Sequence, residues 1–398
     1  PGRAFGRPPR RFLYPLSLAV HARVRAVSFG GQTWKKISLL LLLCLMLLSG
    51  CTDQRETDSL SIISGAAVDF SEKGYRITHE LVGLQEEGKV TPRFIASEGA
   101  SLLSAGRAAQ AQTGRTFYYG HAQSLVISED VAKQGVAAIV DFTSRQKSIA
   151  LSLRPLISRA DTAADLLLPQ PSTEDLASYE FSKMAGGSSP SSAVIDMPFY
   201  HFQSDLNEVG IDPVLPAANV MNDPKDEPNA YFDGTAIFRE DRLVGFLDTP
   251  QTRLLLLMRN ARQEGLLEMA SEDVSFTLFR SRCKIIPQWN DGKPSAVVRL
   301  SVRARLAEEE STVFESAEQA EALCAETLQK QLAEALAVLQ QEYRADSIGI
   351  GRTFSKKMPR QWKELSQNWR SIYPTLPIQV EVDCTLGGSG RTMLKGVK

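Results

Sequence analysis

The stretch IQVEVDCTL, residues 378–386, alternates without exception between apolar and polar side chains. This period of two predicts a strand with one buried face and one solvated face. Its outward row includes the acidic residues Glu381 and Asp383. The outward row of a second predicted strand, residues 298–306, is basic and consists of Arg299, Ser301, Arg303 and Arg305. Opposite charges stabilise adjacent strands, so we expect these two strands to be neighbours in one sheet.

A long amphipathic helix is expected between about Ser316 and Ala345. Its apolar stripe follows spacings of 4, 4, 3 and 4 and consists of Leu328, Leu332, Leu336, Leu339 and Tyr343. This pattern is typical of a helix with one face buried against other elements, and Ser316 with Gln319 fits a capping box. Residues 290–293, Asn-Asp-Gly-Lys, predict a hairpin between two further strands. Residues 229–398 are therefore expected to form a domain of antiparallel sheet packed by a long helix.

The preceding part of the chain alternates between predicted strands and predicted helices. The expected strands are residues 60–70, 75–82, 117–127 and 148–157. The expected helices are residues 97–112, 128–142 and 160–168. Such alternation favours an α/β arrangement. We predict a mixed α/β (α+β) multidomain protein with mixed sheets.

Two stretches of unusual composition suggest how the chain is divided. Residues 185–192 are rich in Gly and Ser and predict a flexible surface loop, whereas residues 212–229 hold four prolines among Asp and Asn. We take the second stretch as the better domain boundary. The expected division is an N-terminal α/β region at 51–228, which the loop could split into two subdomains, followed by the domain at 229–398.

Upstream of these regions the sequence has the layout of a bacterial lipoprotein signal. Lys35 and Lys36 precede an apolar run at residues 37–48, and Leu48-Ser49-Gly50-Cys51 matches a lipobox. The run is shorter than the roughly 20 residues that span a bilayer but suits a signal peptide. We therefore predict a signal peptide at 34–50, a non-native upstream extension at 1–33 and lipidation of Cys51. An ordinary signal peptide or a transmembrane anchor are the alternatives.

The charge balance bears on the partners. Residues 1–50 hold eight basic and no acidic residues, which leaves 37 basic against 46 acidic residues and a formal charge of −9. An acidic surface disfavours nucleic acid as a partner. Two or more acyl chains on Cys51 would instead tether the protein stably to a membrane.

The three cysteines after Cys51 are Cys283, Cys324 and Cys384. Their odd number and the lack of a CxxC spacing disfavour a zinc site. Cys384 shares the apolar face of its strand, so we expect a buried core thiol. A single disulfide among the three stays open.

The sequence offers little for catalysis or for a cofactor. His79, His121 and His201 are the histidines after Cys51, and the chain contains no HExxH, GxSxG, Walker or dinucleotide-binding pattern. We predict no catalytic residues, no metal and no cofactor, and hence no enzyme. An aromatic cluster comprises Phe354, Trp362, Trp369 and Tyr373. Helical spacing favours core packing for this cluster over a carbohydrate or nucleic-acid platform.

Several short motifs together resemble the Ger(x)C family, the lipoprotein C subunit of nutrient germinant receptors in spores. The likeness covers most of residues 36–390. In the first half it rests on Gly50-Cys51-Thr52-Asp53, Arg55-Glu56, Leu60, Gly65, Asp69, Gly120-His121, Val126-Ile127, Val131-Ala132-Lys133, Asp141-Phe142 and Arg145. In the second half it rests on residues 234–238 and 243–248, Thr252-Arg253, Asp346, Gly349, Gly351, Pro359, Trp362, Trp369 and Pro374. Thr52 departs from the pattern, because the family usually has Trp after the lipidated Cys.

The resemblance implies a non-enzymatic, lipid-anchored subunit, carrying for example palmitate, on the outer face of the spore inner membrane. It further implies three α/β domains and assembly with two integral membrane subunits, of A type and B type, that trigger germination by nutrients. Cys51 is the one chemical site that carries over. The alternatives from other classes are a solute-binding lipoprotein of a transporter, which needs two similar lobes around a cleft, and a lipid-anchored hydrolase.

Overall fold

The computed structural model describes residues 36, 38–41, 59–84, 89–187, 193–261, 268–271, 274–309, 314 and 316–387. The chain divides into two compact units, Pro1–Glu56 and Thr57–Lys398, and all elements named below belong to the second unit. Cys51, nearly all of the predicted signal peptide and most of the predicted loop at 185–192 lie outside the described residues.

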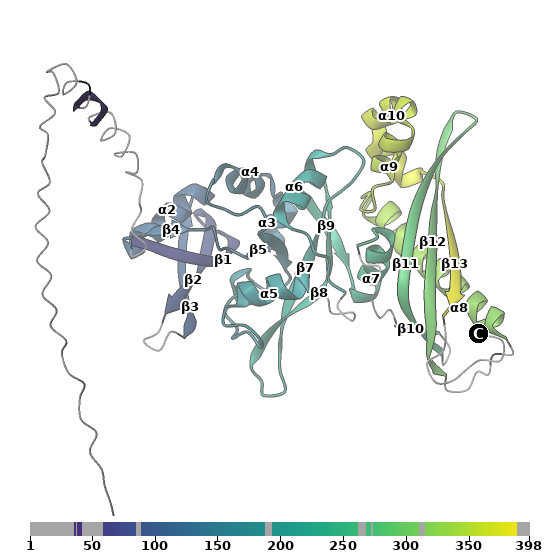
Figure 1. Ribbon diagram of the computed structural model, residues 1–398, viewed down its shortest axis with the longest axis horizontal. Helices are drawn as coiled ribbons and strands as arrows, with labels where there is room; N and C mark the ends of the chain where they lie inside the picture. Colours follow the sequence, from purple (N-terminus) through teal and green to yellow (C-terminus); the bar gives the residue numbers. More distant parts are fainter. Residues whose placement is uncertain are drawn as a thin grey trace, which may run out of the picture. The chain divides into compact units, whose positions relative to one another are not determined.

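The larger sheet of the described residues has nine strands in the order β3-β2-β1-β5-β6-β7-β8-β9, with β4 paired to β1 (Figure 1). The strands are β1 (Leu60–Ser71), β2 (Gly74–Leu84), β3 (Val90–Gly99), β4 (Thr116–Tyr118), β5 (Ser124–Ser128), β6 (Arg154–Ser158), β7 (Val214–Asn222), β8 (Pro228–Arg239) and β9 (Arg242–Leu247). The central pairs β1–β5, β5–β6 and β6–β7 are parallel, whereas the outer pairs are antiparallel. The predicted mixed α/β class is therefore confirmed.

Helices lie on both faces of this sheet (Figure 1). They are α2 (Leu102–Thr113), α3 (Glu129–Gln134), α4 (Ala137–Arg145), α5 (Ala177–Gly186), α6 (Phe199–Asn207) and the 3-10 turn η2 (Ala164–Leu166). Successive side chains of β5 point to opposite faces of the sheet. Val126 belongs to one hydrophobic cluster with Phe181 of α5, whereas Ile127 belongs to another with Val131 of α3. Burial on both sides explains why Leu125, Val126 and Ile127 of β5 form a continuous apolar run instead of alternating with polar residues.

The boundaries of several predicted elements in this half are wrong. The helix expected at 97–112 begins at Leu102, because residues 90–99 form the edge strand β3 and Ser101 makes the capping box with Ser104. An edge strand with many exposed residues and a proline at position 92 lacks the alternation that reveals a strand.

Three further expectations in this half are corrected. The strand expected at 117–127 is two strands, β4 and β5, and the one expected at 148–157 is confined to β6. The helix expected at 160–168 is only the turn η2. The helix expected at 128–142 begins after Ser128 as predicted but breaks at Gly135, whose φ of 126° lies outside the helical region.

The proline-rich stretch at 212–229 is not an irregular linker. It forms β7 and the start of β8, so one sheet continues across residue 228. Its prolines occupy positions that a sheet tolerates, because Pro216 lies at a register shift and Pro224 lies in the turn between the two strands. The domain division at 228 stays a prediction from the sequence.

The smaller sheet of the described residues has four strands in the order β10-β11-β12-β13. They are β10 (Glu268–Ser271), β11 (Val274–Asn290), β12 (Lys293–Glu309) and β13 (Ile378–Leu386). β12 and β13 are neighbours as the charges predicted: Arg299 pairs in register with Glu381, and its Nε lies 2.7 Å from the Glu381 carboxylate. The prediction of an antiparallel sheet holds for β10–β12 but is wrong for β13, which pairs parallel to β12. The long helical connection returns the chain to the same end of the sheet, as a parallel pair requires.

That connection begins with the predicted long helix. It consists of α8 (Ala317–Ala337), the π-helical turn η3 (Val338–Glu342), α9 (Ile350–Lys357), α10 (Pro359–Leu365), η4 (Ser366–Asn368), α11 (Trp369–Ile372) and η5 (Tyr373–Thr375). The predicted apolar stripe is buried from Leu328 to Leu339. Ser316 takes the N-cap position without a side-chain capping bond, so the predicted capping box is not formed.

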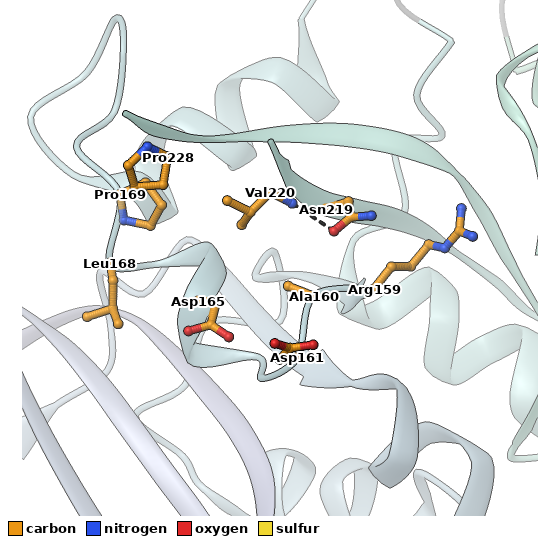
Figure 2. Close-up of a pocket in the computed structure, with 9 residues that line it drawn as sticks. All are labelled: Arg159, Ala160, Asp161, Asp165, Leu168, Pro169, Asn219, Val220 and Pro228. Atoms are coloured by element: carbon orange, nitrogen blue, oxygen red, sulfur yellow. Dashed lines mark hydrogen bonds between the residues drawn. The ribbon is translucent and has the colours of Figure 1, made fainter. Parts of the chain in front are cut away.

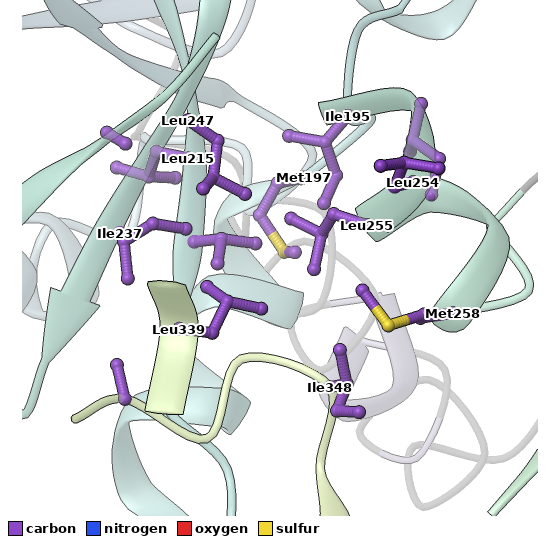
Figure 3. Close-up of a cluster of buried hydrophobic side chains, with 14 of the residues drawn as sticks. Ile195, Met197, Leu215, Ile237, Leu247, Leu254, Leu255, Met258, Leu339 and Ile348 are labelled. Atoms are coloured by element: carbon purple, nitrogen blue, oxygen red, sulfur yellow. The ribbon is translucent and has the colours of Figure 1, made fainter. Parts of the chain in front are cut away.

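The two sheets share one hydrophobic cluster, to which the smaller sheet contributes Val298 and Leu300 of β12. Leu215, Ile237 and Leu247 of the larger sheet contribute to it, together with Leu255 of α7 (Thr249–Met258) and Leu339 of η3. Figure 3 shows these side chains pointing toward one another from strands, helix and turn. The connection after α8 is therefore held by apolar burial against both sheets.

His79 is a buried titratable group in the larger sheet and predicts a pH dependence. It lies on β2, its Nε2 is 3.0 Å from the Tyr119 hydroxyl, and burial lowers its pKa to about 4. In the unfolded chain the pKa is about 6.5. Because the unfolded state binds the proton more tightly, stability is complete above about pH 6.5 and falls as the pH drops toward 4, by about 3 kcal/mol in all.

We expect His79→Gln to reduce the slope of unfolding free energy against pH between 4 and 6.5, measured by urea unfolding. The exposed His201 provides the matched control, and His201→Gln should leave the slope as it is. Equal slopes in the wild type and His79→Gln would contradict this assignment.

Candidate functional site

The predicted lipidation site, Cys51, lies outside the described residues. Among the helices of the described residues, none combines the length and apolar character that crossing a bilayer requires. The same residues contain no group of three or more His, Cys, Asp or Glu side chains that could hold a metal ion.

Gly351 and Trp369, two of the residues that carry the family resemblance, meet around the carboxyl group of Asp346, which is 1% exposed. Its Oδ1 accepts the main-chain N–H of Ile350 at 2.9 Å, and its Oδ2 accepts that of Gly351 at 2.8 Å. The indole N–H of Trp369 donates to the same Oδ2 at 3.1 Å. One carboxylate therefore satisfies the first turn of α9 and fixes an aromatic side chain from α11.

A second buried carboxylate, Asp212, joins this group to the start of β7. Its Oδ2 accepts the N–H of Asp346 at 2.7 Å, while its own N–H donates to the Asp346 carbonyl at 3.0 Å. Burial raises the pKa of Asp346 to about 7, against the lowering effect of the Gly351 and Ile350 N–H groups. Burial likewise raises the pKa of Asp212. Both carboxyl groups accept hydrogen bonds from donors of the chain, and together they join α9 and α11 to the segment before β7.

Glycine is required where α9 meets the loop before β7. Gly210 has a φ of 98°, and an added Cβ there would lie 2.7 Å from the main-chain carbon of Gly351. A Cβ on Gly351 would lie 2.6 Å from the Trp369 Nε1. The N–H of Arg352 donates to the Gly210 carbonyl at 2.7 Å across this contact. Side chains at either glycine would separate the two segments and break that bond.

The predicted aromatic cluster packs directly behind Asp346. The Trp369 ring centroid lies 5.7 Å from that of Phe354, 5.2 Å from that of Trp362 and 6.1 Å from that of Tyr373. Phe354, Trp369 and Tyr373 are all less than 4% exposed. The prediction that these aromatic side chains pack in the core is confirmed for Phe354, Trp369 and Tyr373, which are too buried to form an open platform for a carbohydrate or nucleic acid.

A charged network lies beside the carboxylates. Asp205, 4% exposed, accepts from Arg259 Nη2 at 2.9 Å and also binds the guanidinium of Arg352. Arg352 reaches the more exposed Glu208 at 2.7 Å, and Arg259 Nη1 donates to the Ser347 carbonyl at 2.7 Å. Burial lowers the pKa of Arg259, and Asp205 opposes that change. The network links α6, α7 and the segment before α9.

Sequence reasoning singled out Asp346, Gly349, Gly351 and Trp369 but missed Asp205, Asp212 and Arg259. Asp212 stands among prolines and acids, where a carboxylate is ordinarily exposed in a turn. Nothing in the sequence around Asp212 distinguishes it from the neighbouring acidic residues. Its role arises because the turn is covered by the segment at 345–351.

The same network predicts unequal effects of two similar substitutions. Asp205→Asn removes the carboxylate that pairs directly with the buried Arg259, so we expect the free energy of unfolding to fall by about 3 kcal/mol. Glu208→Gln is the matched control, because Glu208 also pairs with Arg352 but is 38% exposed on its side chain. We expect Glu208→Gln to lower the free energy of unfolding by less than about 1 kcal/mol. Urea unfolding of both variants measures this, and similar losses would contradict the buried-charge explanation.

A polar groove with a volume of about 510 Å³ lies at the carboxyl end of β6 (Figure 2). Figure 2 shows Asp161 and Asp165 on one wall and Asn219 with Val220 of β7 on the other. Most of its charges are already engaged. Arg159 pairs with Asp233 at 2.7 Å and lies over the Phe246 ring, and Asp165 accepts the Thr162 N–H at 2.9 Å. The groove offers an open polar surface and no catalytic grouping.

Two family models match the chain. The model described as "Spore germination protein N-terminal domain" covers residues 53–220, and the model described as "Spore germination B3/ GerAC like, C-terminal" covers residues 233–390. The chain belongs to this GerAC-like family of spore germination proteins. The predicted family is therefore confirmed.

Individual members of the GerAC-like family are distant but match over nearly their full length. "Putative spore germination protein YfkR" of Bacillus subtilis (strain 168) is 25% identical, over 90% of this chain and 97% of the relative. "Spore germination protein KC" of the same organism is 23% identical, over 89% of this chain and 95% of the relative. The crystal structure of the GerBC protein has a TM-score of 0.53 at 18% identity, covering 81% of this chain and 97% of that one, and shows the same fold.

Proposed function

We propose that this chain is a non-enzymatic, lipid-anchored subunit of a spore germinant receptor. It is tethered through Cys51 to the outer face of the spore inner membrane and assembles there with two integral membrane subunits. The observation that carries the proposal is the pair of family matches over residues 53–220 and 233–390, directly behind the lipobox at 48–51. The protein acts by contact with its partners during the response to nutrients.

The buried charges support an assembly role over a chemical one. Asp346, Asp212 and Asp205 are each hydrogen-bonded or ion-paired inside the chain, where they join the helices after α8 to the larger sheet. The solute-binding alternative gains no such support, because it needs two similar lobes. The described residues instead form one nine-stranded and one four-stranded sheet.

The anchor is tested by Cys51→Ala. We expect loss of radiolabelled palmitate incorporation and release of the protein from the membrane fraction, since the acyl chains supply the membrane affinity. Cys44→Ala is the matched control, because Cys44 lies in the apolar run seven residues earlier and should be dispensable. Full membrane retention of the Cys51→Ala protein would contradict the proposed anchor.

The receptor role is tested by deleting the gene and scoring nutrient-triggered germination. We expect germination to be lost, to be restored by the wild-type gene or Cys44→Ala, and not to be restored by Cys51→Ala. Normal germination of the deletion strain, in a background without a second copy, would contradict the proposal. Germination by agents that bypass receptors should be unaffected, which distinguishes a receptor defect from a general spore defect.

A further inference from the structure

Two buried thiols face each other between the long helix and the last strand. Cys324 of α8 is 0% exposed, Cys384 of β13 is 6% exposed, and their Sγ atoms lie 2.8 Å apart. Non-bonded sulfur atoms do not ordinarily approach so closely. A disulfide bond is about 2.05 Å long, so only a small further approach of roughly 0.8 Å separates these sulfurs from bonding distance.

Both cysteines are held by rigid elements that are already attached to each other. Cys384 pairs in register with the buried Val302 of β12, in the middle of a parallel ladder. Three residues before Cys324 on α8, Glu321 accepts the Leu386 N–H at 2.8 Å. The helix and the strand are thus joined to each other close to the thiol pair.

The third cysteine of this region provides a contrast. Cys283 is also buried, but it lies on β11 opposite Leu300, and its main-chain N–H and carbonyl bond to the Asn260 side chain. Burial raises the pKa of its thiol to about 11. Cys283 is therefore an internal control for thiol burial without a facing thiol.

We propose that Cys324 and Cys384 form a disulfide bond in the exported protein. Formation removes one hydrogen from each thiol, so two electrons and two protons leave as the sulfur–sulfur bond is made. A small-molecule disulfide or a dithiol-disulfide oxidase accepts the electrons by exchange: a mixed disulfide forms on one cysteine and the other cysteine then displaces it. The oxidant is reduced to two thiols, which balances the reaction. This inference goes beyond the receptor role, but it rests on the export that the proposed function includes.

Burial determines how this exchange can occur. The hydrogen bond with Cys324 and burial both raise the pKa of the Cys384 thiol, which disfavours the attacking thiolate in the closed structure. Exchange therefore requires α8 to separate briefly from β13. Once formed, the bond is protected from reductants by the same burial, so it acts as a stable crosslink.

The crosslink closes a long loop of the chain. The two cysteines are 60 positions apart, and the segment between them contains α9–α11 and the carboxylate of Asp346. Closing a loop restricts the unfolded chain, and the model-dependent effect grows with loop length. Oxidation should therefore stabilise the connection that carries the Asp346 group without changing its folded geometry.

The decisive test is peptide mapping of the full chain purified without reductant and equilibrated with oxidised glutathione. Free thiols are alkylated in denaturant before digestion, and the peptides are identified by mass spectrometry. We expect the Cys324 and Cys384 peptides as one linked species, two hydrogens lighter than their sum, and Cys283 as an alkylated free thiol. Alkylation of both Cys324 and Cys384 in most molecules, or linkage of either to another cysteine, would overturn the proposal.

Thermal unfolding provides the second measurement. The oxidised chain should unfold several degrees above a chain that has been reduced with dithiothreitol in denaturant and refolded in its presence. Cys283→Ala should keep that difference, whereas Cys324→Ala/Cys384→Ala should abolish it. If the double variant does not fold, the mapping of the wild-type chain still decides. An equal midpoint with and without reductant, in a chain shown to be linked, would refute the stabilising role.

Discussion

The buried carboxylate of Asp346 is the constraint on which the C-terminal connection depends. A carboxylate is costly to remove from water unless donors surround it, and here two main-chain N–H groups of α9 and one indole N–H do so. Those donors can reach it only if α9 begins at Ile350, if Trp369 lies against that helix and if Gly351 carries no side chain. One carboxyl group thus determines where α9 and α11 must lie.

Asp212 extends this constraint to the larger sheet. The reciprocal main-chain and side-chain bonds between Asp212 and Asp346 connect residues 134 positions apart. The apolar cluster around Leu339 and Leu215 surrounds the junction and supplies the non-directional part of its stability. The hydrogen bonds make one arrangement of these segments specific, because any other arrangement of the same apolar groups would leave a buried carboxylate unpaired.

Sequence reasoning succeeded where one physical signal dominated. The alternation at 378–386 and the stripe from Leu328 to Leu339 each reflect a single buried face, and both elements are present. The match of acidic and basic rows also identified β12 and β13 as neighbours. Sequence reasoning failed where the tertiary surroundings of a segment determine its structure. β3 lacks a clear alternation of apolar and polar residues because it is an edge strand. β7 was not predicted because it lies in a proline-rich stretch, in which the sheet accommodates Pro216 at a register shift.

The sequence by itself determined the mixed class and the apolar faces, because these depend on residues close together in the chain, and it determined the family through the order and spacing of many short motifs. The tertiary structure alone decided the parallel direction of β13, the sheet that runs across residue 228, and the pairing of Asp346 with Asp212 and of Cys324 with Cys384. Each of these joins segments that are distant in sequence. The secondary-structure propensity of a segment contains no information about which distant residues will bury its side chains. Those distant residues determine whether a carboxyl group or a thiol becomes a buried, paired group.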